Sequence, residues 1–215
     1  MAGRSAYPGA EEYLPGGRSL PTLRKAAAAC RGCDLYEDAT QVVFGHGPAD
    51  ARLMLVGEQP GDVEDKDGKP FVGPAGKVLA RAVTDAGLDE IPTFVTNAVK
   101  HFSYRRSGKR RLHQTPKAGP ISACRPWLRA EIEAVHPELL VCLGSVAVKA
   151  VLGNDVRVLR DRGTILDRDG LVGRGRFLVT VHPSSILRTP PEDRDTAYAA
   201  LVADLKVAAS VLSDR

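Results

Sequence analysis

Long apolar segments are missing from this sequence of 215 residues. No run of about 18 apolar residues is present, whereas a membrane-spanning helix needs about 20. The first residues, MAGRSAYPGAEEYLPGG, also lack the apolar stretch of a secretory signal. Because 43% of the residues are hydrophobic, the chain can still bury a core. We therefore expect a soluble cytoplasmic protein of one domain, without a membrane partner.

Cysteine is scarce, and the four cysteines are Cys30, Cys33, Cys124 and Cys142. Disulfides rarely persist in the cytoplasm, so we expect these thiols to serve metal binding or redox chemistry. Cys30 and Cys33 form a C-x2-C turn, which presents two thiolates together. Four thiolates can hold an iron–sulfur cluster or a zinc ion, and the sequence leaves both open. The alternative is that Cys124 and Cys142 are ordinary buried thiols, since Cys142 lies in an apolar run.

Acidic residues are absent from Ile91 to Ala130, although the whole chain holds 26 of them. Nine basic residues in that segment contribute +9 to a net charge of +4, which leaves −5 for the remaining chain. A basic block of this kind is typical of a surface that contacts the phosphate backbone of nucleic acid. The alternative is a solvated loop. The nine residues are Lys100, Arg105, Arg106, Lys109, Arg110, Arg111, Lys117, Arg125 and Arg129.

Predicted strands alternate with predicted helices along the chain. Apolar runs predict strands at residues 52–57, 94–97, 139–144 and 177–181. Helical spacing predicts helices at residues 23–29, 74–86, 120–135, 145–152 and 196–211. We expect a long basic loop at 100–119 and a hairpin or irregular insertion at 156–173. This order predicts a single-domain three-layer α/β/α fold with a central, mainly parallel four-stranded sheet over residues 21–215, after a loose N-terminal tail of residues 1–20.

Polar or glycine-rich residues follow all four predicted strands. In open α/β sheets the ligand binds outside the carboxyl ends of the strands. We therefore expect these residues to converge on one crevice. The clusters are Glu58–Asp62, Asn97, Gly144-Ser145 and His182–Ser185.

Four motifs occur in order at or between these strand ends. They are GEQPG at Gly57–Gly61, PFVGPAG at Pro70–Gly76, Thr96-Asn97, and HPSSILR at His182–Arg188. Together, over residues 30 to about 212, they resemble the uracil-DNA glycosylase superfamily. The cysteine arrangement resembles the iron–sulfur glycosylases of family 4. This resemblance implies a monomeric base-excision enzyme of DNA repair that acts on uracil-containing DNA. It also implies a [4Fe–4S] cluster held by Cys30, Cys33, Cys124 and Cys142.

The basic segment contains KRRLHQTP at Lys109–Pro116, which resembles the KRRIH loop of the UdgX class. Leu112 stands where that class has isoleucine, an apolar exchange that should not alter the chemistry. The class excises uracil and stays covalently attached to the DNA through the loop histidine. The resemblance implies that a neutral ring nitrogen of His113 attacks C1′ of the sugar and that the enzyme works only once.

The resemblance also assigns roles in the recognition and departure of the base. Phe71 would stack on the flipped uracil, and the Asn97 amide would pair with its O4 and N3–H groups. His182 would donate a hydrogen bond to O2 of the departing uracil anion. Glycine would let the backbone approach the base closely. The residues expected to shape the pocket are Gly57, Gln59, Gly61 and Asp62.

The remaining site residues are expected at the sugar and the phosphates. Glu58 would orient His113, take its proton or steady the sugar cation. Arg111 would hold the loop closed or contact a phosphate. We expect the substrate to be single-stranded DNA and leave open whether duplex DNA is also bound. The residues expected to contact phosphates are Lys109, Arg110, Ser184, Ser185 and Arg188.

Two alternatives remain open at this point. One is a multiple-turnover uracil-DNA glycosylase of the family 4 type, and the loop with His113 is the feature against it. The other is a DNA-binding module with a structural cluster and no chemistry. The expected convergence of Glu58, Asn97 and His182 is the feature against that one.

Overall fold

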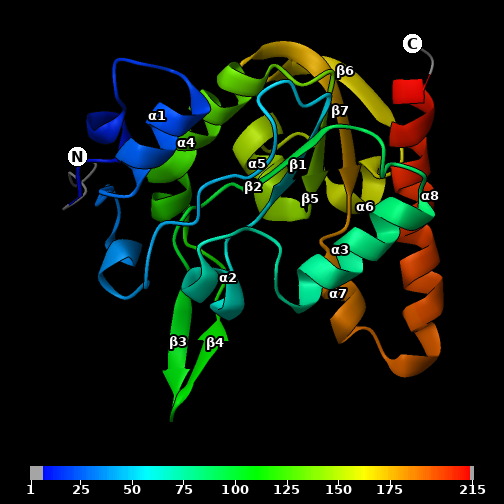
Figure 1. The fold of residues 1–215 in the computed structure, drawn as a ribbon. Helices are drawn as coiled ribbons and strands as arrows, with labels where there is room; N and C mark the ends of the chain where they lie inside the picture. Colours follow the sequence, from blue (N-terminus) through cyan, green and yellow to red (C-terminus); the bar gives the residue numbers. More distant parts are fainter. Residues whose placement is uncertain (1–6, 214–215) are drawn as a thin grey trace.

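A five-stranded sheet forms the centre of the computed structural model, which describes residues 7–213 (Figure 1). The strand order is β2-β1-β5-β7-β6. Four strands run parallel, and β6 pairs antiparallel with β7 at one edge. The predicted α/β fold with a mainly parallel sheet is confirmed, with one strand more than predicted. The strands are β1 (Leu53–Gly57), β2 (Thr93–Asn97), β5 (Leu139–Leu143), β6 (Ile165–Gly170) and β7 (Gly173–Thr180).

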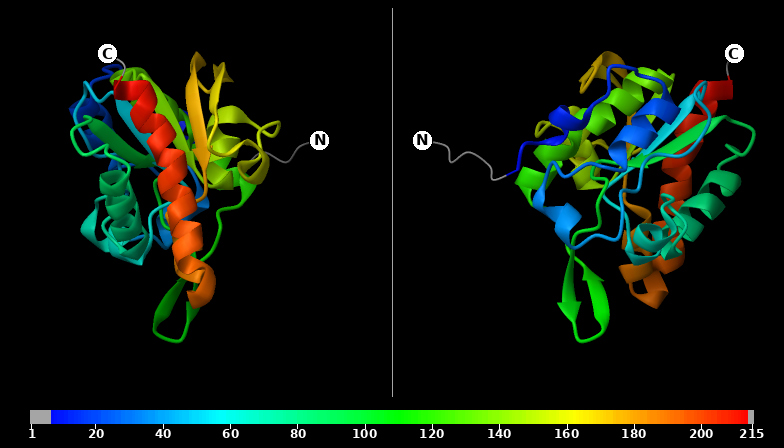
Figure 2. Two further views of the ribbon diagram at one scale, coloured as in Figure 1. Left: turned by 90° about the vertical axis from the view of Figure 1, so that its right-hand side faces the viewer. Right: turned by 60° about the vertical axis from the view of Figure 1, so that its left-hand side comes forward.

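Helices cover both faces of the sheet, because apolar side chains of the strands alternate between the two faces (Figures 1 and 2). In β1, Met54 and Val56 belong to one core cluster, whereas Leu53 and Leu55 belong to the other. The first cluster includes residues of α1 (Leu20–Ala27), α4 (Ala118–Val135) and α5 (Ser145–Leu152). The second includes residues of α3 (Pro74–Asp85) and α8 (Arg194–Ser213).

The C-terminal helical segment Pro191–Ser213 is long and apolar enough to cross a membrane by length and composition alone. In this fold it is a core helix, because one side of α8 is buried against the sheet and α3. The Arg52 side chain, beside β1, also donates a 2.9 Å hydrogen bond to the carbonyl of Leu212. The buried residues of α8 include Leu201, Leu205, Ala208 and Leu212.

The segment expected to be a hairpin or irregular insertion consists of α6 (Val158–Asp161) and β6. β6 turns directly into β7 at Gly170 and Gly173, so the two strands form a hairpin at the sheet edge. Its sequence did not predict a strand of the central sheet, because half-exposed and exposed charged residues interrupt the apolar pattern. Such charges are common on edge strands, where they prevent pairing with a second molecule.

The N-terminal residues are more ordered than a loose tail. Residues 1–6 lie outside the described part of the chain, but Ala10–Tyr13 form a short 3-10 helix, η1, that packs on α4. Ala10 is 1% exposed, and the Gly9 amide donates a 2.9 Å hydrogen bond to the carbonyl of Gly32. A side chain at Gly32 would collide with this backbone. Residues 9–13 are therefore docked on α4 and beside the C-x2-C turn.

The predicted basic loop contains an antiparallel hairpin of β3 (Tyr104–Ser107) and β4 (Arg110–His113), which projects from the body of the molecule (Figures 1 and 2). Gly108 adopts a φ of 57° in its two-residue turn, a backbone conformation that suits glycine. Its sequence shows no alternation of apolar and polar residues because both strands of the hairpin are largely exposed. Its exposed basic side chains are Arg105, Arg106, Lys109 and Arg110.

Lys100 does not belong to this exposed basic surface. Its side chain is 1% exposed, and its ammonium group lies 2.6 Å from a carboxylate oxygen of Glu131 in α4. Glu131 is itself fully buried and also accepts hydrogen bonds from the Thr96 hydroxyl and the Gly45 amide. A buried charge needs such partners. The prediction that all nine basic residues form one phosphate-contacting block is therefore wrong for Lys100.

Candidate active site and cysteine cluster

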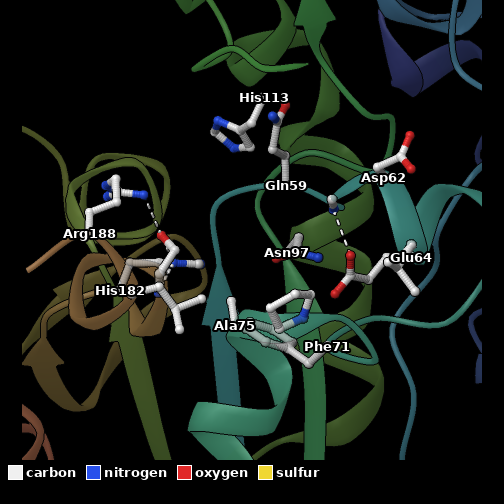
Figure 3. A pocket seen from close by; sticks show the side chains of 14 residues that line it. Gln59, Asp62, Glu64, Phe71, Ala75, Asn97, His113, His182 and Arg188 are labelled. Atoms are coloured by element: carbon white, nitrogen blue, oxygen red, sulfur yellow. Dashed lines mark hydrogen bonds between the residues drawn. The ribbon is translucent and has the colours of Figure 1, made fainter. Parts of the chain in front are cut away.

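The predicted strand-end residues converge at the carboxyl edge of the sheet. A cavity of about 360 Å³ is lined by Gln59 after β1, Asn97 at the end of β2, and His182 after β7 (Figure 3). Gly144 and Ser145, after β5, line an adjoining cavity of about 520 Å³. Residues His113, His182, Ser184 and Arg188 line both. A largely apolar cavity that carries a few polar groups from several strand ends can bind a small planar ligand.

Phe71 forms one wall of the cavity and faces His182 (Figure 3). The two rings are stacked, with centroids 6.2 Å apart and an interplanar angle of 28°. Phe71 has a φ of 57°, which is unusual for a residue with a side chain. A Cβ atom at Gly57 would lie 2.6 Å from Cζ of Phe71 and would also strike Oδ1 of Asn97. Gly57 therefore makes room for both side chains.

Asn97 lies at the centre of the site and is 2% exposed (Figure 3). Its Oδ1 atom is buried and has no hydrogen-bond partner among residues 7–213. Its backbone carbonyl accepts a 2.7 Å hydrogen bond from the buried Lys100 ammonium group. An unpaired buried amide oxygen is costly, so its presence at a cavity indicates a polar ligand.

His182 is oriented by the turn that follows it. Its Nδ1 accepts a hydrogen bond from the Ser184 amide at 3.2 Å, and the Ser184 hydroxyl lies 2.8 Å from the same nitrogen. Arg188 donates to that hydroxyl at 3.0 Å (Figure 3). Burial, with help from His113 and Arg188, lowers the pKa of His182 to about 4. A neutral imidazole that accepts at Nδ1 carries its proton on Nε2, which can donate to a ligand.

Glu58 and His113 both line the second cavity, and His113 lines the first as well. Nε2 of His113 is 3.6 Å from Oε1 of Glu58, and that oxygen has no hydrogen-bond partner within residues 7–213. Burial raises the pKa of Glu58, whereas the Thr115 hydrogen bond and Arg188 lower it. Burial and Arg188 lower the pKa of His113, which favours its neutral form. At this separation a small movement would bring the His113 ring within hydrogen-bond distance of the carboxylate, which could orient a neutral imidazole or take a proton from an imidazolium.

Gln59 lines the cavity, but its amide group holds the hairpin. The side-chain nitrogen donates to the carbonyls of Ser103 and Gln114 at 3.0 and 3.1 Å. The side-chain oxygen accepts from the Ser103 amide at 2.9 Å. Ser103 precedes β3 and Gln114 follows β4, so one buried side chain clamps both ends of the hairpin. The sequence motif predicted a pocket residue but not this function.

Arg111 and Asp62 form a second attachment of the hairpin. Arg111 Nε is 2.5 Å from an Asp62 carboxylate oxygen, and one terminal nitrogen is 2.6 Å from the buried Asp65 carboxylate. Both acids lie in α2 (Asp62–Asp67), the short helix that follows the GEQPG motif. The guanidinium also lies 5.1 Å from the Tyr104 ring centroid. The structure thus fits the expectation that Arg111 holds the loop closed. Asp62 lines the cavity, as predicted, and also pairs with Arg111.

The residues expected to contact phosphates lie at two sides of the cavity. Lys109 and Arg110 are exposed on the projecting hairpin. Arg188 is exposed in α7 (Pro183–Arg188), the short helix that follows His182. The Ser185 hydroxyl already donates to the His182 carbonyl at 2.7 Å, so its first role is to shape the turn.

Glu64 is a cavity residue that sequence reasoning missed. It is 7% exposed and accepts hydrogen bonds from the amides of Gly61 and Gly73 at 3.1 and 2.9 Å (Figure 3). These two bonds join the GEQPG segment to the segment that carries Phe71. A glutamate three residues after the capping residue that precedes a helix, here Gly61, is a known capping signal. That signal could have identified Glu64, although the helix itself was not predicted.

All four cysteines are free and buried, but they do not form one group. Burial, with smaller contributions from the nearby thiols of Cys33 and Cys30, raises the pKa of Cys124 to about 12 although Lys100 opposes the shift. Burial alone raises the pKa of Cys142, which lies in the middle of β5. Among residues 7–213, no group of three or more His, Cys, Asp or Glu side chains is already arranged to hold a metal ion. Metal binding would therefore deprotonate these thiols and draw them together.

Comparison with known proteins identifies relatives of this chain. Residues 44–206 match the family model of the uracil DNA glycosylase superfamily. The chain is 36% identical over 160 residues to the type-4 uracil-DNA glycosylase of Thermotoga maritima, covering 74% of this chain and 78% of the relative. It is 30% identical over 176 residues to the type-4 enzyme of Archaeoglobus fulgidus, covering 80% and 85%. A type-5 uracil-DNA glycosylase of Pyrobaculum aerophilum is 33% identical over 158 residues, covering 65% and 64%.

Proposed function

The chain belongs to the uracil-DNA glycosylase superfamily, and we propose that it binds a uracil flipped out of DNA and cuts the bond between the base and its deoxyribose. One observation carries this proposal: Asn97, whose buried Oδ1 has no hydrogen-bond partner among residues 7–213, lines one cavity together with Phe71 and His182. A pocket for a flipped base needs a flat ring for stacking, a polar group that hydrogen-bonds the edge of the base, and a donor that stabilises the charge on the departing base. Phe71, Asn97 and His182 supply these three groups in that order.

The Asn97 amide explains selection for uracil. Its nitrogen can donate to O4 of the base while its oxygen accepts from N3–H. Cytosine presents a donor at N4 and an acceptor at N3. The amide nitrogen, a donor, would then face the N4 donor, and the amide oxygen, an acceptor, would face the N3 acceptor. The backbone carbonyl of Asn97 accepts a hydrogen bond from the Lys100 ammonium group, and its side-chain oxygen lies in the space left by the missing side chain of Gly57. A buried polar group discriminates strongly against a base that cannot form its hydrogen bonds, because the group is then left unpaired.

His182 supports departure of the base. As the bond between C1′ and N1 breaks, its electron pair passes to the uracil, and the charge spreads onto O2. The Nε2–H group of a neutral His182 can donate to that oxygen, which lowers the energy of the leaving anion. The tautomer is maintained by the hydrogen bond that Nδ1 accepts from the Ser184 amide.

The named relatives support a reaction in which water attacks the sugar after the base has left. The type-4 enzymes of Thermotoga maritima and Archaeoglobus fulgidus are named as uracil-DNA glycosylases. In this reaction a water molecule bonds to C1′, and Glu58 takes its proton or orients it. The unpaired Oε1 of Glu58 supports this role. The enzyme is then free for another turnover.

One observation favours a second candidate, covalent capture of the DNA. His113 Nε2 is 3.6 Å from Glu58, and the hairpin that carries His113 is clamped by Gln59. In this candidate a neutral ring nitrogen of His113 bonds to C1′ as uracil leaves, and Glu58 takes the proton from the resulting imidazolium. An alkylated imidazole is a poor leaving group, so one turnover would trap the enzyme.

A denaturing gel with a uracil-containing oligonucleotide separates the two candidates. Hydrolysis gives free uracil and an abasic strand, with more product than enzyme. Capture gives free uracil and a heat-stable protein–DNA band that saturates at one equivalent of enzyme. His113→Ala should abolish that band, and Gln114→Ala, an exposed neighbour, is the matched control. A band that persists in His113→Ala would exclude His113 as the nucleophile.

We also propose that the cysteines hold a [4Fe–4S] cluster, as in the iron–sulfur glycosylases that this chain resembles. The proximity of Cys124 to Cys30 and Cys33 supports it. When bound, the cluster would join the segment after α1 to α4 and so stabilise the wall behind β2. Zinc remains the alternative metal for thiolate ligands. Iron and zinc content of the purified protein separates the two, because a colourless zinc protein would contradict the cluster.

A further inference from the structure

We propose that α6, with the exposed side chains of Arg157 and Leu159, is a second DNA-binding element, which contacts the duplex on one flank of the flipped nucleotide. The inference rests on the proposed function, because it takes DNA as the substrate. It deepens that function by assigning a surface to DNA outside the cavity. Figure 1 shows α6 beside the carboxyl end of β7, away from the β3–β4 hairpin.

α6 belongs to the rim of the site. Val158 lines the cavity of about 520 Å³ together with Glu58 and His113. α6 also packs against β7, whose carboxyl end leads into the site. Arg157 and Leu159 are the sequence neighbours of Val158, so their Cα atoms lie about 3.8 Å from that of a residue that lines the cavity. Both side chains therefore start at the edge of the site.

Leu159 is the most exposed large apolar side chain in the described part of the chain. It is 85% exposed, whereas the three others, Val63, Val172 and Leu187, are between 40% and 46% exposed. Val63 and Leu187 line the first cavity, so three of these four side chains lie at the site. Single exposed apolar residues are common on proteins, but their concentration at one edge indicates an interaction surface.

The position of α6 is fixed by contacts of the residues that follow it. The Arg162 guanidinium donates a 2.9 Å hydrogen bond to a carboxylate oxygen of Asp204 in α8, and the Thr180 hydroxyl donates to the same oxygen. Asp204 is buried. The Gly163 amide donates a 3.0 Å hydrogen bond to a carbonyl of β7. A segment held in this way loses little conformational entropy when Leu159 contacts a partner.

The charge beside Leu159 suits a phosphate backbone. Arg157 and Arg160 are both exposed. Arg160 pairs with Asp161 at 2.8 Å, whereas the Arg157 guanidinium makes no hydrogen bond or ion pair with residues 7–213. Minor-groove contacts combine basic side chains, which meet phosphates, with apolar side chains, which meet sugars and bases. Duplex DNA that already enters the adjoining cavity would offer both to this surface.

Binding of full and shortened duplexes by full-length proteins tests the inference. Arg157→Ala/Leu159→Ala is compared with wild type, and Val172→Ala/Arg174→Ala is the matched control at the amino end of β7. The DNA carries 2′-fluoro-2′-deoxyuridine, whose electron-withdrawing fluorine destabilises the sugar cation and so slows cleavage during the measurement. Fluorescence anisotropy gives the affinity for a full duplex and for duplexes shortened on the 5′ or the 3′ side of the uracil.

Arg157→Ala/Leu159→Ala should bind the full duplex roughly tenfold more weakly than wild type and lose about one unit of salt slope. Shortening one flank, and only one, should weaken wild type by a similar factor. The same shortening should have no further effect on the double variant, because the contact is already lost. The control should bind every duplex as wild type does.

Two results would overturn the inference. One is equal affinity of wild type and Arg157→Ala/Leu159→Ala for the full duplex. The other is a loss of the same size on the full duplex and on both shortened ones, which would indicate general damage instead of a flank contact. Far-UV circular dichroism verifies that the variants are folded. Release of uracil from ordinary deoxyuridine DNA tests the proposed function separately, since wild type can release uracil and still show no contact at α6.

Discussion

Asn97 is the residue that we propose to read the base with its side-chain amide. Its side-chain oxygen lies close to Gly57, and its backbone carbonyl accepts a hydrogen bond from the buried ammonium group of Lys100. No other side chain competes for its Oδ1 atom within residues 7–213. Burying this oxygen without a partner costs free energy, and that cost is offset only when a ligand donates a hydrogen bond to it.

Replacement of Asn97 by alanine should therefore reduce uracil excision by roughly a hundredfold or more, because the buried edge of the base loses its partner. Single-turnover release of uracil from an oligonucleotide measures the effect. Asn154→Ala is the matched control, since Asn154 is exposed in the segment before α6. An unchanged rate in Asn97→Ala would mean that another group reads the base.

The lowered pKa of His182 predicts that the stability of the folded protein depends on pH. Its pKa is about 4 in the folded protein, against an ordinary value of 6.5. Between these values the unfolded chain binds the proton and the folded one does not, so stability falls as the pH decreases from about 6.5 to about 4. The loss should be on the order of 2–3 kcal/mol. Urea unfolding of wild type and His182→Asn measures it, and equal pH slopes in the two proteins would refute the assignment.

Sequence reasoning identified the residues of the site more accurately than their individual roles. Glu58, Asn97 and His182 were predicted at strand ends and lie around adjoining cavities. Gln59 was predicted as a pocket residue, but its hydrogen bonds to Ser103 and Gln114 depend on a hairpin that the sequence did not predict. Roles that depend on partners distant in the chain cannot be read from a local motif.

At the scale of elements, buried strands and amphipathic helices were predictable. β1 and β5 are apolar runs because both of their faces are covered, and such runs are clear in a sequence. β6 was expected only within a hairpin or irregular insertion, and the β3–β4 hairpin was expected as a loop, because both are edge or projecting segments with exposed charged residues. Their stability comes from pairing and from contacts with other elements, and a local apolar pattern does not report these.

The ion pair between Lys100 and Glu131 joins the end of β2 to α4. Lys100→Met would leave the Glu131 carboxylate buried without its charge partner, so it should destabilise the protein by about 3–5 kcal/mol. The double variant Lys100→Met/Glu131→Gln should be more stable than the single one, because no charge remains buried. Chemical denaturation measures both.

Arg129→Met in the same helix is the control for this pair, because Arg129 is exposed and its replacement should change stability by less than about 0.5 kcal/mol. If Lys100→Met were as stable as this control, the ion pair would have no structural importance. The same double-variant cycle also shows whether the pair positions Asn97. In that case uracil excision should fall in Lys100→Met under conditions where the protein remains folded.

At the scale of the whole molecule, positive charge projects from one end. The hairpin extends beyond the carboxyl edge of the sheet, and its exposed strands carry Lys109 and Arg110 beside the His113 that faces the cavity (Figures 1 and 2). DNA that enters the cavity would pass this hairpin. Basic side chains there would neutralise phosphates and release counterions.

Replacement of Lys109 and Arg110 by alanine should weaken DNA binding and reduce the salt dependence of affinity by up to about two units of slope. Fluorescence anisotropy over a range of salt concentrations measures both. Arg168→Ala/Arg174→Ala is a control of equal charge, because these residues lie on β6 and β7 toward the opposite end of the molecule. Equal salt slopes for the two double variants would show that the hairpin does not contact the phosphates.

The most direct test of uracil excision is the intact mass of the products formed from an oligonucleotide with a single uracil, with a thymine oligonucleotide as control. The proposed function predicts free uracil and a DNA strand that has lost its base, either free or attached to the protein, and no change in the thymine strand. The Asn97→Ala variant should leave nearly all of the uracil strand unchanged under the same conditions. An unaltered uracil strand after incubation with the wild-type, folded protein would contradict the account.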